Sequence, residues 1–177
     1  MKYSIAVIPG DGVGPVVVEA ALKVLGALSK LFSVEIDFKV LEAGDRTKKQ
    51  SGTALPNLTL NEVRASHACL KGPVGETARE VILPLRQKLD LYANIRPAKS
   101  LPNISSAVEG VDLVVIRENT EGLYKGIEEK TSDYSFSVRV ITKRCSSRIA
   151  KVAYETALQR RRKVTIVHKA NVLRSCE

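Results

Sequence analysis

Short apolar runs alternate along the chain with amphipathic segments. The runs have the pattern of β-strands and occupy residues 3–8, 33–40, 67–70, 89–96, 111–116 and 163–167. The amphipathic segments repeat apolar residues every three or four positions, as helices do, at residues 16–31, 58–63, 78–88 and 146–160. This alternation predicts an α/β fold with a mainly parallel sheet flanked by helices.

The remaining segments predict connections. The polar stretch 44–56 is expected to be a loop, and turn residues around Thr131 predict a hairpin within residues 122–142. Thr77 is expected to cap the helix that follows it. The stretch 97–110 is rich in Pro, Ser and Asn and predicts a crossing between two domains.

One strand and one glycine-rich turn bear on the kind of fold. The run 111–116 is typical of a strand buried in a parallel sheet. Gly10, Gly12 and Gly14 follow the first strand, but their Gly-x-Gly-x-Gly spacing differs from the dinucleotide-binding fingerprint. The turn therefore argues against a Rossmann fold, and the sequence leaves open whether it is a tight turn or a functional loop.

Composition and charge narrow the function classes. Apolar residues make up 44% of the chain, which is enough for a packed core. The net charge of +9 comes with only 5% aromatic residues, so we expect no nucleic-acid partner. No apolar run approaches the length of a membrane span, and the first residues do not resemble a signal peptide. The three cysteines are widely spaced, which favours a reducing cytoplasm over a zinc or disulfide framework.

Five residues form a set with a shared chemistry. They are Arg86, Arg96, Arg117, Tyr124 and Lys169. Arginine binds carboxylates through two parallel hydrogen bonds, whereas tyrosine and a buried lysine can move protons. Arg117 and Lys169 each follow a predicted strand, where ligands of α/β proteins gather. The set suggests an enzyme for a small polycarboxylate, although each residue alone could be an ordinary surface group.

The helix 78–88 carries a mixed face. Arg79, Ile82, Leu83 and Arg86 fall on one side at helical spacing. The face can belong to a ligand site or to a half-buried helix with arginines that reach into solvent.

Several blocks, taken together, resemble the decarboxylating β-hydroxyacid dehydrogenases, the group of 3-isopropylmalate, isocitrate and homoisocitrate dehydrogenases. The likeness is strongest to archaeal members that act on 3-isopropylmalate. The matching blocks occur in the order of the family and occupy residues 5–15, 70–76, 89–99, 117–124 and 168–172. The resemblance implies the isopropylmalate dehydrogenase-like α/β fold, which is not a Rossmann fold.

The resemblance also implies roles. Arg86, Arg96 and Arg117 match the arginines that bind the malate carboxylates, and Tyr124 matches the tyrosine that protonates the enol. Lys169 matches a lysine that removes a proton in the active site of the partner subunit, so a homodimer is implied. The matches near the nicotinamide of NAD are Gly72, Pro73, Val74 and Asn171. Residues 1–98 would belong to the cofactor-side domain, and residues 99–177 to the domain for substrate and dimerisation.

The implied reaction is NAD-dependent oxidative decarboxylation of 3-isopropylmalate to 2-oxoisocaproate, a step of leucine biosynthesis, assisted by Mg²⁺ or Mn²⁺. Ile82 and Leu83 suit the isopropyl group and are expected to bind it. Arg79 lies on the same face and suits an additional carboxylate, which leaves isocitrate and homoisocitrate as alternatives.

The resemblance covers only the N-terminal half of a family member. The metal ligands of the family lie beyond Glu177, so no metal ligand is expected in this chain. We therefore expect a truncated fold and an inactive fragment when the chain stands alone. A non-catalytic remnant that binds carboxylates is the alternative from another functional class.

Overall fold

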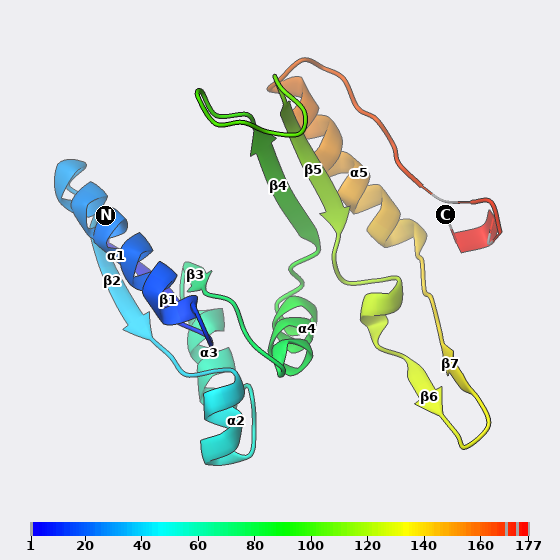
Figure 1. Cartoon of the computed structure of the whole chain (residues 1–177), viewed down its shortest axis with the longest axis horizontal. Coiled ribbons are helices and arrows are strands. Elements are labelled where there is room, and N and C mark those ends of the chain that lie inside the picture. Colours follow the sequence, from blue (N-terminus) through cyan, green and yellow to red (C-terminus); the bar gives the residue numbers. More distant parts are fainter. Residues whose placement is uncertain (1, 169, 173, 177) are drawn as a thin grey trace. The chain divides into compact units, whose positions relative to one another are not determined.

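The computed structural model describes residues 2–168, 170–172 and 174–176 (Figure 1). The chain divides into two compact units, Met1–Leu89 and Asp90–Glu177, each of which is described by itself. The division falls earlier than the crossing that the sequence predicts at residue 98. The assignment of residues 1–98 and 99–177 to a cofactor-side and a substrate domain stays a prediction.

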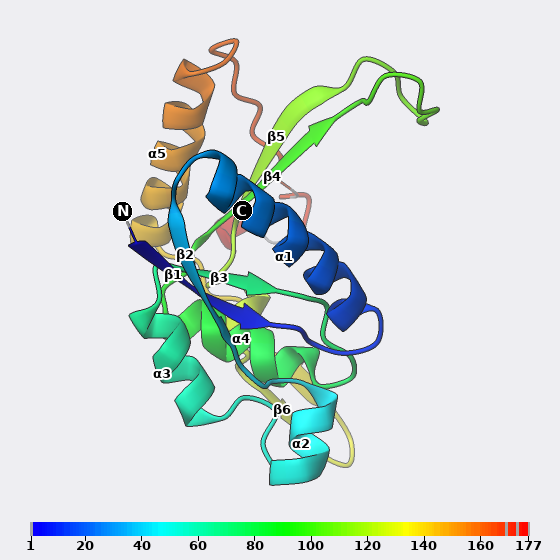
Figure 2. The ribbon, with the colours of Figure 1, turned by 90° about the vertical axis from the view of Figure 1, so that its left-hand side faces the viewer.

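The first unit is an α/β layer structure. Its elements are β1 (Lys2–Ile8), α1 (Gly14–Leu31), β2 (Glu35–Val40), α2 (Asp45–Ser51), α3 (Asn57–Ala65), β3 (Ala68–Lys71) and α4 (Ala78–Lys88). The strands pair in the order β2-β1-β3, and both pairings are parallel. The parallel sheet with flanking helices is confirmed, and Figure 2 shows α1 on one side of it and α3 and α4 on the other.

The core of this unit lies between the sheet and the helices α3 and α4. Ala6 and Ile8 of β1 point to one face of the sheet because alternate strand residues share a face. They pack in one cluster with residues of the two helices, namely Leu60, Val63, Val81 and Leu85. The amphipathic pattern of α3 and α4 therefore predicts their buried faces correctly.

The stretch 44–56 was expected to be a loop, and this prediction was wrong in part. Residues Asp45–Ser51 form the helix α2, which ends where Gly52 adopts a left-handed conformation with φ of 79°. The helix is short and polar, and Thr47 is its buried residue. Because it has no apolar stripe, hydrophobic periodicity could not reveal it.

The second unit contains an antiparallel strand pair covered by one helix. Its elements are β4 (Ala93–Lys99), β5 (Asp112–Glu118), a 3-10 helix (Leu123–Lys125), β6 (Glu128–Lys130), β7 (Ser135–Ser137), α5 (Lys143–Leu158) and a 3-10 turn (Arg174–Cys176). The strands β6 and β7 form the predicted hairpin, and β4 pairs with β5 in antiparallel register.

Two strand predictions in this unit were wrong. The run 111–116 was expected in a buried parallel sheet, but β5 pairs antiparallel with β4, and exposed residues alternate with half-buried ones along it. Residues 163–167 were expected to form a strand and lie outside any helix or strand, largely exposed. A strand needs a paired neighbour, which a local apolar pattern cannot supply.

The helix α5 begins three positions before the predicted start at residue 146. Thr142 precedes it, and the Thr142 hydroxyl accepts a hydrogen bond from the Cys145 backbone N–H at 3.2 Å. This side-chain cap satisfies a backbone donor that the helix leaves without a partner. Thr77, by contrast, does not cap α4 through its side chain. Of the helices described, none is both long and apolar enough to cross a membrane.

Candidate functional site

Arg117 and Tyr124 lie together in the second unit. Arg117 is near the end of β5, and Tyr124 is in the 3-10 helix that follows. The guanidinium carbon of Arg117 lies 4.9 Å from the centroid of the Tyr124 ring. A cation at this distance is attracted electrostatically to the face of the ring. The structure thus brings two of the predicted site residues together.

Arg96 shares a strand face with Arg117. Asn94 is the partner of Arg117 in the antiparallel register, and Arg96 is two residues further along the same strand. Residues two apart point to the same face, so these three polar side chains occupy one face of the β4–β5 pair. The Arg96 Nε donates a hydrogen bond to the Asn94 Oδ1 at 3.0 Å. Two of the three predicted substrate arginines therefore share one exposed face.

The opposite face of the strand pair is covered by α5. Ion pairs form at both ends of β5. Arg148 lies 3.8 Å from Glu118 at one end, and the Arg160 Nη2 donates a hydrogen bond to Asp112 at 2.5 Å at the other. Asp112 and Glu118 point to the face that Arg117 avoids, since their positions differ from 117 by an odd number. Helix packing on one face thus leaves the arginine face open to solvent.

The carboxylates of Glu118 and Glu121 stabilise the turn between Arg117 and Tyr124. Glu118 accepts hydrogen bonds from the backbone N–H groups of Thr120 and Glu121 at 2.8 and 2.7 Å. Glu121 is buried and accepts from the backbone N–H and the hydroxyl of Thr142 at 2.8 and 3.0 Å. This turn fixes the spacing between the arginine and the tyrosine, and the sequence analysis assigned no role to either glutamate.

Arg148 of α5 joins the segment that leads into β4 to the segment that leaves β5, at one end of the strand pair. Its Nη1 lies 2.8 and 2.6 Å from the two carboxylate oxygens of Asp90, and its Nη2 donates to the Thr120 hydroxyl at 2.9 Å. Its guanidinium carbon lies 4.2 Å from the centroid of the Tyr92 ring. The side chain is 17% exposed. Sequence reasoning missed this residue because its partners lie far away along the chain.

The pKa of Glu121 provides a test of this turn. Burial acts to raise the pKa of Glu121, but hydrogen bonds from the Cys145 thiol and from Thr142 outweigh it and hold the pKa below its usual value. A lowered pKa in the folded state stabilises the fold above the ordinary glutamate pKa, and this stabilisation is lost as the pH falls through the folded pKa.

We expect Glu121→Gln to lower the free energy of unfolding at neutral pH and to matter progressively less at acidic pH, as the pH falls through the lowered pKa of the folded parent and its carboxylate becomes protonated. Urea unfolding at a neutral and an acidic pH measures this difference. Glu109→Gln, at an exposed position of the connection, is the matched control and should change neither value. If Glu121→Gln lowered the free energy of unfolding equally at both pH values, this would contradict the stabilising role of the ionised Glu121 carboxylate.

The remaining predicted substrate residues lie on α4 of the first unit. Val81 and Leu85 of this helix are buried in the core, whereas Ile82, Leu83 and Arg86 are half-buried. Arg79 is exposed on the same helix. The helix therefore presents a partly apolar surface with a cationic end, as the sequence predicts, and its buried side keeps that surface in place.

Arg86 has a cationic neighbour at the end of β3. Burial lowers the pKa of Lys71, and the nearby Arg86 guanidinium adds to the effect. The Lys71 Nζ donates a hydrogen bond to the Gly72 carbonyl. Two cations near the predicted nicotinamide loop make this edge of the sheet suitable for an anionic ligand.

The loop of Gly72, Pro73 and Val74 lies against the glycine-rich turn after β1. The Gly72 N–H donates to the Ile8 carbonyl, and the Asp11 N–H donates to the Pro73 carbonyl, both at 2.8 Å. A Cβ atom on Gly10 would lie 1.9 Å from the Pro73 carbonyl oxygen, and φ of Gly10 is 76°. The glycine-rich segment therefore forms a tight turn that packs on the loop.

Two predicted site residues lie near the end of the chain. Lys169 lies outside the described residues, so its predicted role stays a prediction. Asn171 is exposed and belongs to no helix or strand. Its predicted place near the nicotinamide also stays a prediction.

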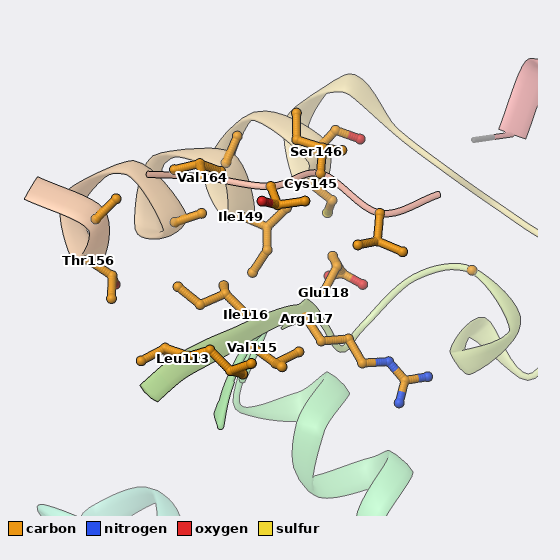
Figure 3. Close-up of a pocket in the computed structure, with 18 of the residues that line it drawn as sticks. Leu113, Val115, Ile116, Arg117, Glu118, Cys145, Ser146, Ile149, Thr156 and Val164 are labelled. Atoms are coloured by element: carbon orange, nitrogen blue, oxygen red, sulfur yellow. The ribbon is translucent and has the colours of Figure 1, made fainter. Parts of the chain in front are cut away.

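A cavity of about 1290 Å³ lies beside β5 and α5 in the second unit. Apolar residues line much of it, including Leu113, Ile116, Ile149 and Val164, as Figure 3 shows. The Arg117 side chain extends away from these groups. The apolar part of this cavity suits packing of apolar groups rather than binding of a polycarboxylate.

Within the described part of the chain, no group of three or more His, Cys, Asp or Glu side chains is placed to hold a metal ion. Carboxylates such as Asp45 and Glu121 accept hydrogen bonds from backbone N–H groups instead. The described residues thus do not fit the divalent metal that the resemblance implies.

Comparison with known proteins shows the family. The family of isocitrate/isopropylmalate dehydrogenases matches residues 4–177. A 3-isopropylmalate dehydrogenase of Saccharolobus solfataricus is 51% identical over 98% of this chain and 52% of its own length. One from Sulfurisphaera tokodaii is 47% identical, again over 98% of this chain and 52% of its own length.

A solved structure agrees with these matches. The isocitrate dehydrogenase of Methylococcus capsulatus superposes with a TM-score of 0.86 at 43% identity, over 98% of this chain and 53% of its own. The chain thus spans about half the length of these relatives. Together with the α/β fold described above, the matches show that the chain belongs to the isocitrate/isopropylmalate dehydrogenase family.

Proposed function

We propose that this chain supplies the carboxylate-binding part of an enzyme that oxidatively decarboxylates 3-isopropylmalate with NAD. The observation that carries the proposal is the exposed strand face with Arg96 and Arg117, which has Tyr124 at its end. Each guanidinium can form two parallel hydrogen bonds with one carboxylate. A malate skeleton has two carboxylates, and Arg86 of the first unit would be a further cationic contact.

The proposed reaction has three steps. When bound, NAD would accept a hydride from the carbon that bears the hydroxyl, and the hydroxyl would lose its proton to a base, for which we propose Lys169 of the partner subunit. The resulting β-keto acid loses carbon dioxide. Tyr124, which lies beside the Arg117 guanidinium, then protonates the enol.

The residues near the proposed cofactor fit an anionic ligand better than they fit a metal. Lys71 and Arg86 make this region cationic, and we propose that the loop of Gly72, Pro73 and Val74 contacts the nicotinamide together with Asn171. A divalent metal, Mg²⁺ or Mn²⁺, would draw electrons from the carbonyl during decarboxylation. The described residues provide no group of side chains to bind this metal.

The choice of substrate follows from α4. Ile82 and Leu83 are half-buried and apolar, and burial of an isopropyl group against them is expected to contribute about 2 kcal/mol. Isocitrate and homoisocitrate carry a third carboxylate instead. Exposed Arg79 on the same helix favours this second candidate, as does the likeness to a structure named isocitrate dehydrogenase. We further propose a homodimer in the cytoplasm.

The test uses a joined enzyme, in which residues 1–177 are followed by the part of the Saccharolobus solfataricus relative beyond the matched region. We expect NAD reduction with Mg²⁺ and a kcat/KM for 3-isopropylmalate at least about tenfold above that for isocitrate or homoisocitrate. Arg79→Ala should leave turnover of 3-isopropylmalate unchanged.

Three outcomes would change the proposal. If kcat/KM is higher for isocitrate, and Arg79→Ala abolishes this preference, the proposed substrate becomes isocitrate or homoisocitrate. A folded joined enzyme without activity, beside an active parent relative, would support a non-catalytic chain. The 177-residue chain alone is expected to be inactive, because its described residues lack a metal-binding group.

A further inference from the structure

Asp11 collects three backbone donors from two other segments of the first unit. Its carboxylate accepts hydrogen bonds from the N–H groups of Asp45 at 3.0 and 3.1 Å, of Arg46 at 3.4 Å and of Gly75 at 3.1 Å. Asp45 and Arg46 begin α2, and Gly75 lies in the segment that leads to α4. One carboxylate therefore joins the turn after β1 to both segments.

Asp45 extends this connection to the start of α4. Its carboxylate accepts from the N–H groups of Glu76 and Thr77 at 3.0 and 2.8 Å, and from the Thr77 hydroxyl at 2.7 Å. The hydrogen bonds from Thr77 lower the pKa of Asp45. Thr77 is buried and immediately precedes α4. The Thr77 hydroxyl thus donates a hydrogen bond to Asp45 and accepts none from the backbone of α4.

Glycines allow both carboxylates to approach the backbone closely. A Cβ atom on Gly44 would lie 2.3 Å from an oxygen of Asp11, and one on Gly75 would lie 2.1 Å from an oxygen of Asp45. Real Cβ atoms do not approach an oxygen this closely, so a side chain at either position would displace the carboxylate. The sequence thus provides small residues where the two acids need room.

The residues held in this way are those with proposed contacts to ligands. The segment from Gly72 to Thr77 carries the proposed nicotinamide loop, and α4 carries Ile82, Leu83 and Arg86. At its other end the segment is tied to the glycine-rich turn by the hydrogen bond from Asp11 N–H to the Pro73 carbonyl. Asp11 thus bonds to Pro73 and Gly75, and Asp45 bonds to the two residues that follow, Glu76 and Thr77.

We propose that Asp11 and Asp45 are positioning residues, which hold the nicotinamide loop and the start of α4 in the geometry that binds cofactor and substrate. The proposal rests on the proposed function for what the loop binds. The geometry of the loop itself, however, is measurable without any ligand.

The first measurement is backbone amide hydrogen exchange in the 177-residue chain. Asp11→Asn and Asp45→Asn each place an amide NH₂ group toward backbone donors, so roughly tenfold faster exchange is expected at Gly75, Glu76 and Thr77. Asp37→Asn is the matched control, because Asp37 is an exposed carboxylate of β2 in the same sheet. It should leave the exchange of these amides unchanged.

A milder variant distinguishes local loosening of the loop from general unfolding. Thr77→Val keeps the shape of the side chain and removes one donor to Asp45, so the exchange at residues 75–77 should rise while that of Ala6 and Ile8 in the core stays unchanged. Unchanged exchange at residues 75–77 in all three variants would overturn the proposal, as would faster exchange spread equally over the core.

The second measurement separates positioning from stability in the joined enzyme. We expect Asp11→Asn and Asp45→Asn to raise the KM for NAD about tenfold, because the nicotinamide loop loses its anchors. The KM does not depend on the amount of folded enzyme, so a merely structural role would lower the melting temperature and leave the KM unchanged. That result would overturn the positioning role. A parent joined enzyme without activity would contradict the proposed function, and the exchange result would still decide whether the acids hold the loop.

Discussion

Arg117→Gln is expected to lower kcat/KM for 3-isopropylmalate at least about a hundredfold in the joined enzyme. The guanidinium can form two charged hydrogen bonds with a substrate carboxylate, whereas glutamine offers neutral donors without the fork geometry. The substitution also removes the cation that lies 4.9 Å from the Tyr124 ring. Steady-state kinetics with NAD in excess measure the change.

Arg144→Gln is the matched control for this substitution. Arg144 belongs to the same unit, its side chain is 78% exposed, and its contact with Asp90 is long, at 4.0 Å. Such surface ion pairs contribute little to stability. We expect kcat/KM to stay within about twofold of the parent. Equal effects of the two substitutions would remove Arg117 from the proposed site.

Leu85→Ala is expected to cost about 3 kcal/mol of the free energy of unfolding. Leu85 is 6% exposed and packs in the core between the sheet, α3 and α4. Its removal leaves a cavity directly beneath the helix that carries Arg86. Denaturant unfolding of the 177-residue chain, followed by far-ultraviolet circular dichroism, measures the loss.

Leu31→Ala makes the same chemical change at a site that is 73% exposed, in a helix of the same unit. The free energy of unfolding of the Leu31→Ala variant should stay within about 0.5 kcal/mol of that of the parent. A similar loss for both leucines would show that the core does not lie where α4 meets the sheet.

Elements with a strong local pattern could be predicted from the sequence. The strands β1 and β2 alternate or run apolar, and α1, α4 and α5 repeat apolar residues at helical spacing. The helix α2 lacks this pattern, because Thr47 is its buried residue. The pairing of β5 with β4 is a long-range choice, and an apolar run of this kind is compatible with either strand direction.

The candidate site residues could be predicted from the sequence better than the residues that hold them in place. Charged residues at strand ends pointed to Arg117, and the structure places it beside Tyr124 on the face that Arg96 shares. Arg148 and Asp11 were missed, because their partners lie far along the chain. Each looks like an ordinary charged residue in the sequence, and only the fold reveals the donors and acceptors that it joins.

The most direct test of the account is the product balance of the joined enzyme with 3-isopropylmalate labelled in the carboxylate that is lost. The account predicts one labelled carbon dioxide for each NADH formed, and loss of both when Arg117 is replaced by glutamine. NADH formation without release of carbon dioxide, or equal product formation by the parent and the Arg117→Gln variant, would contradict it.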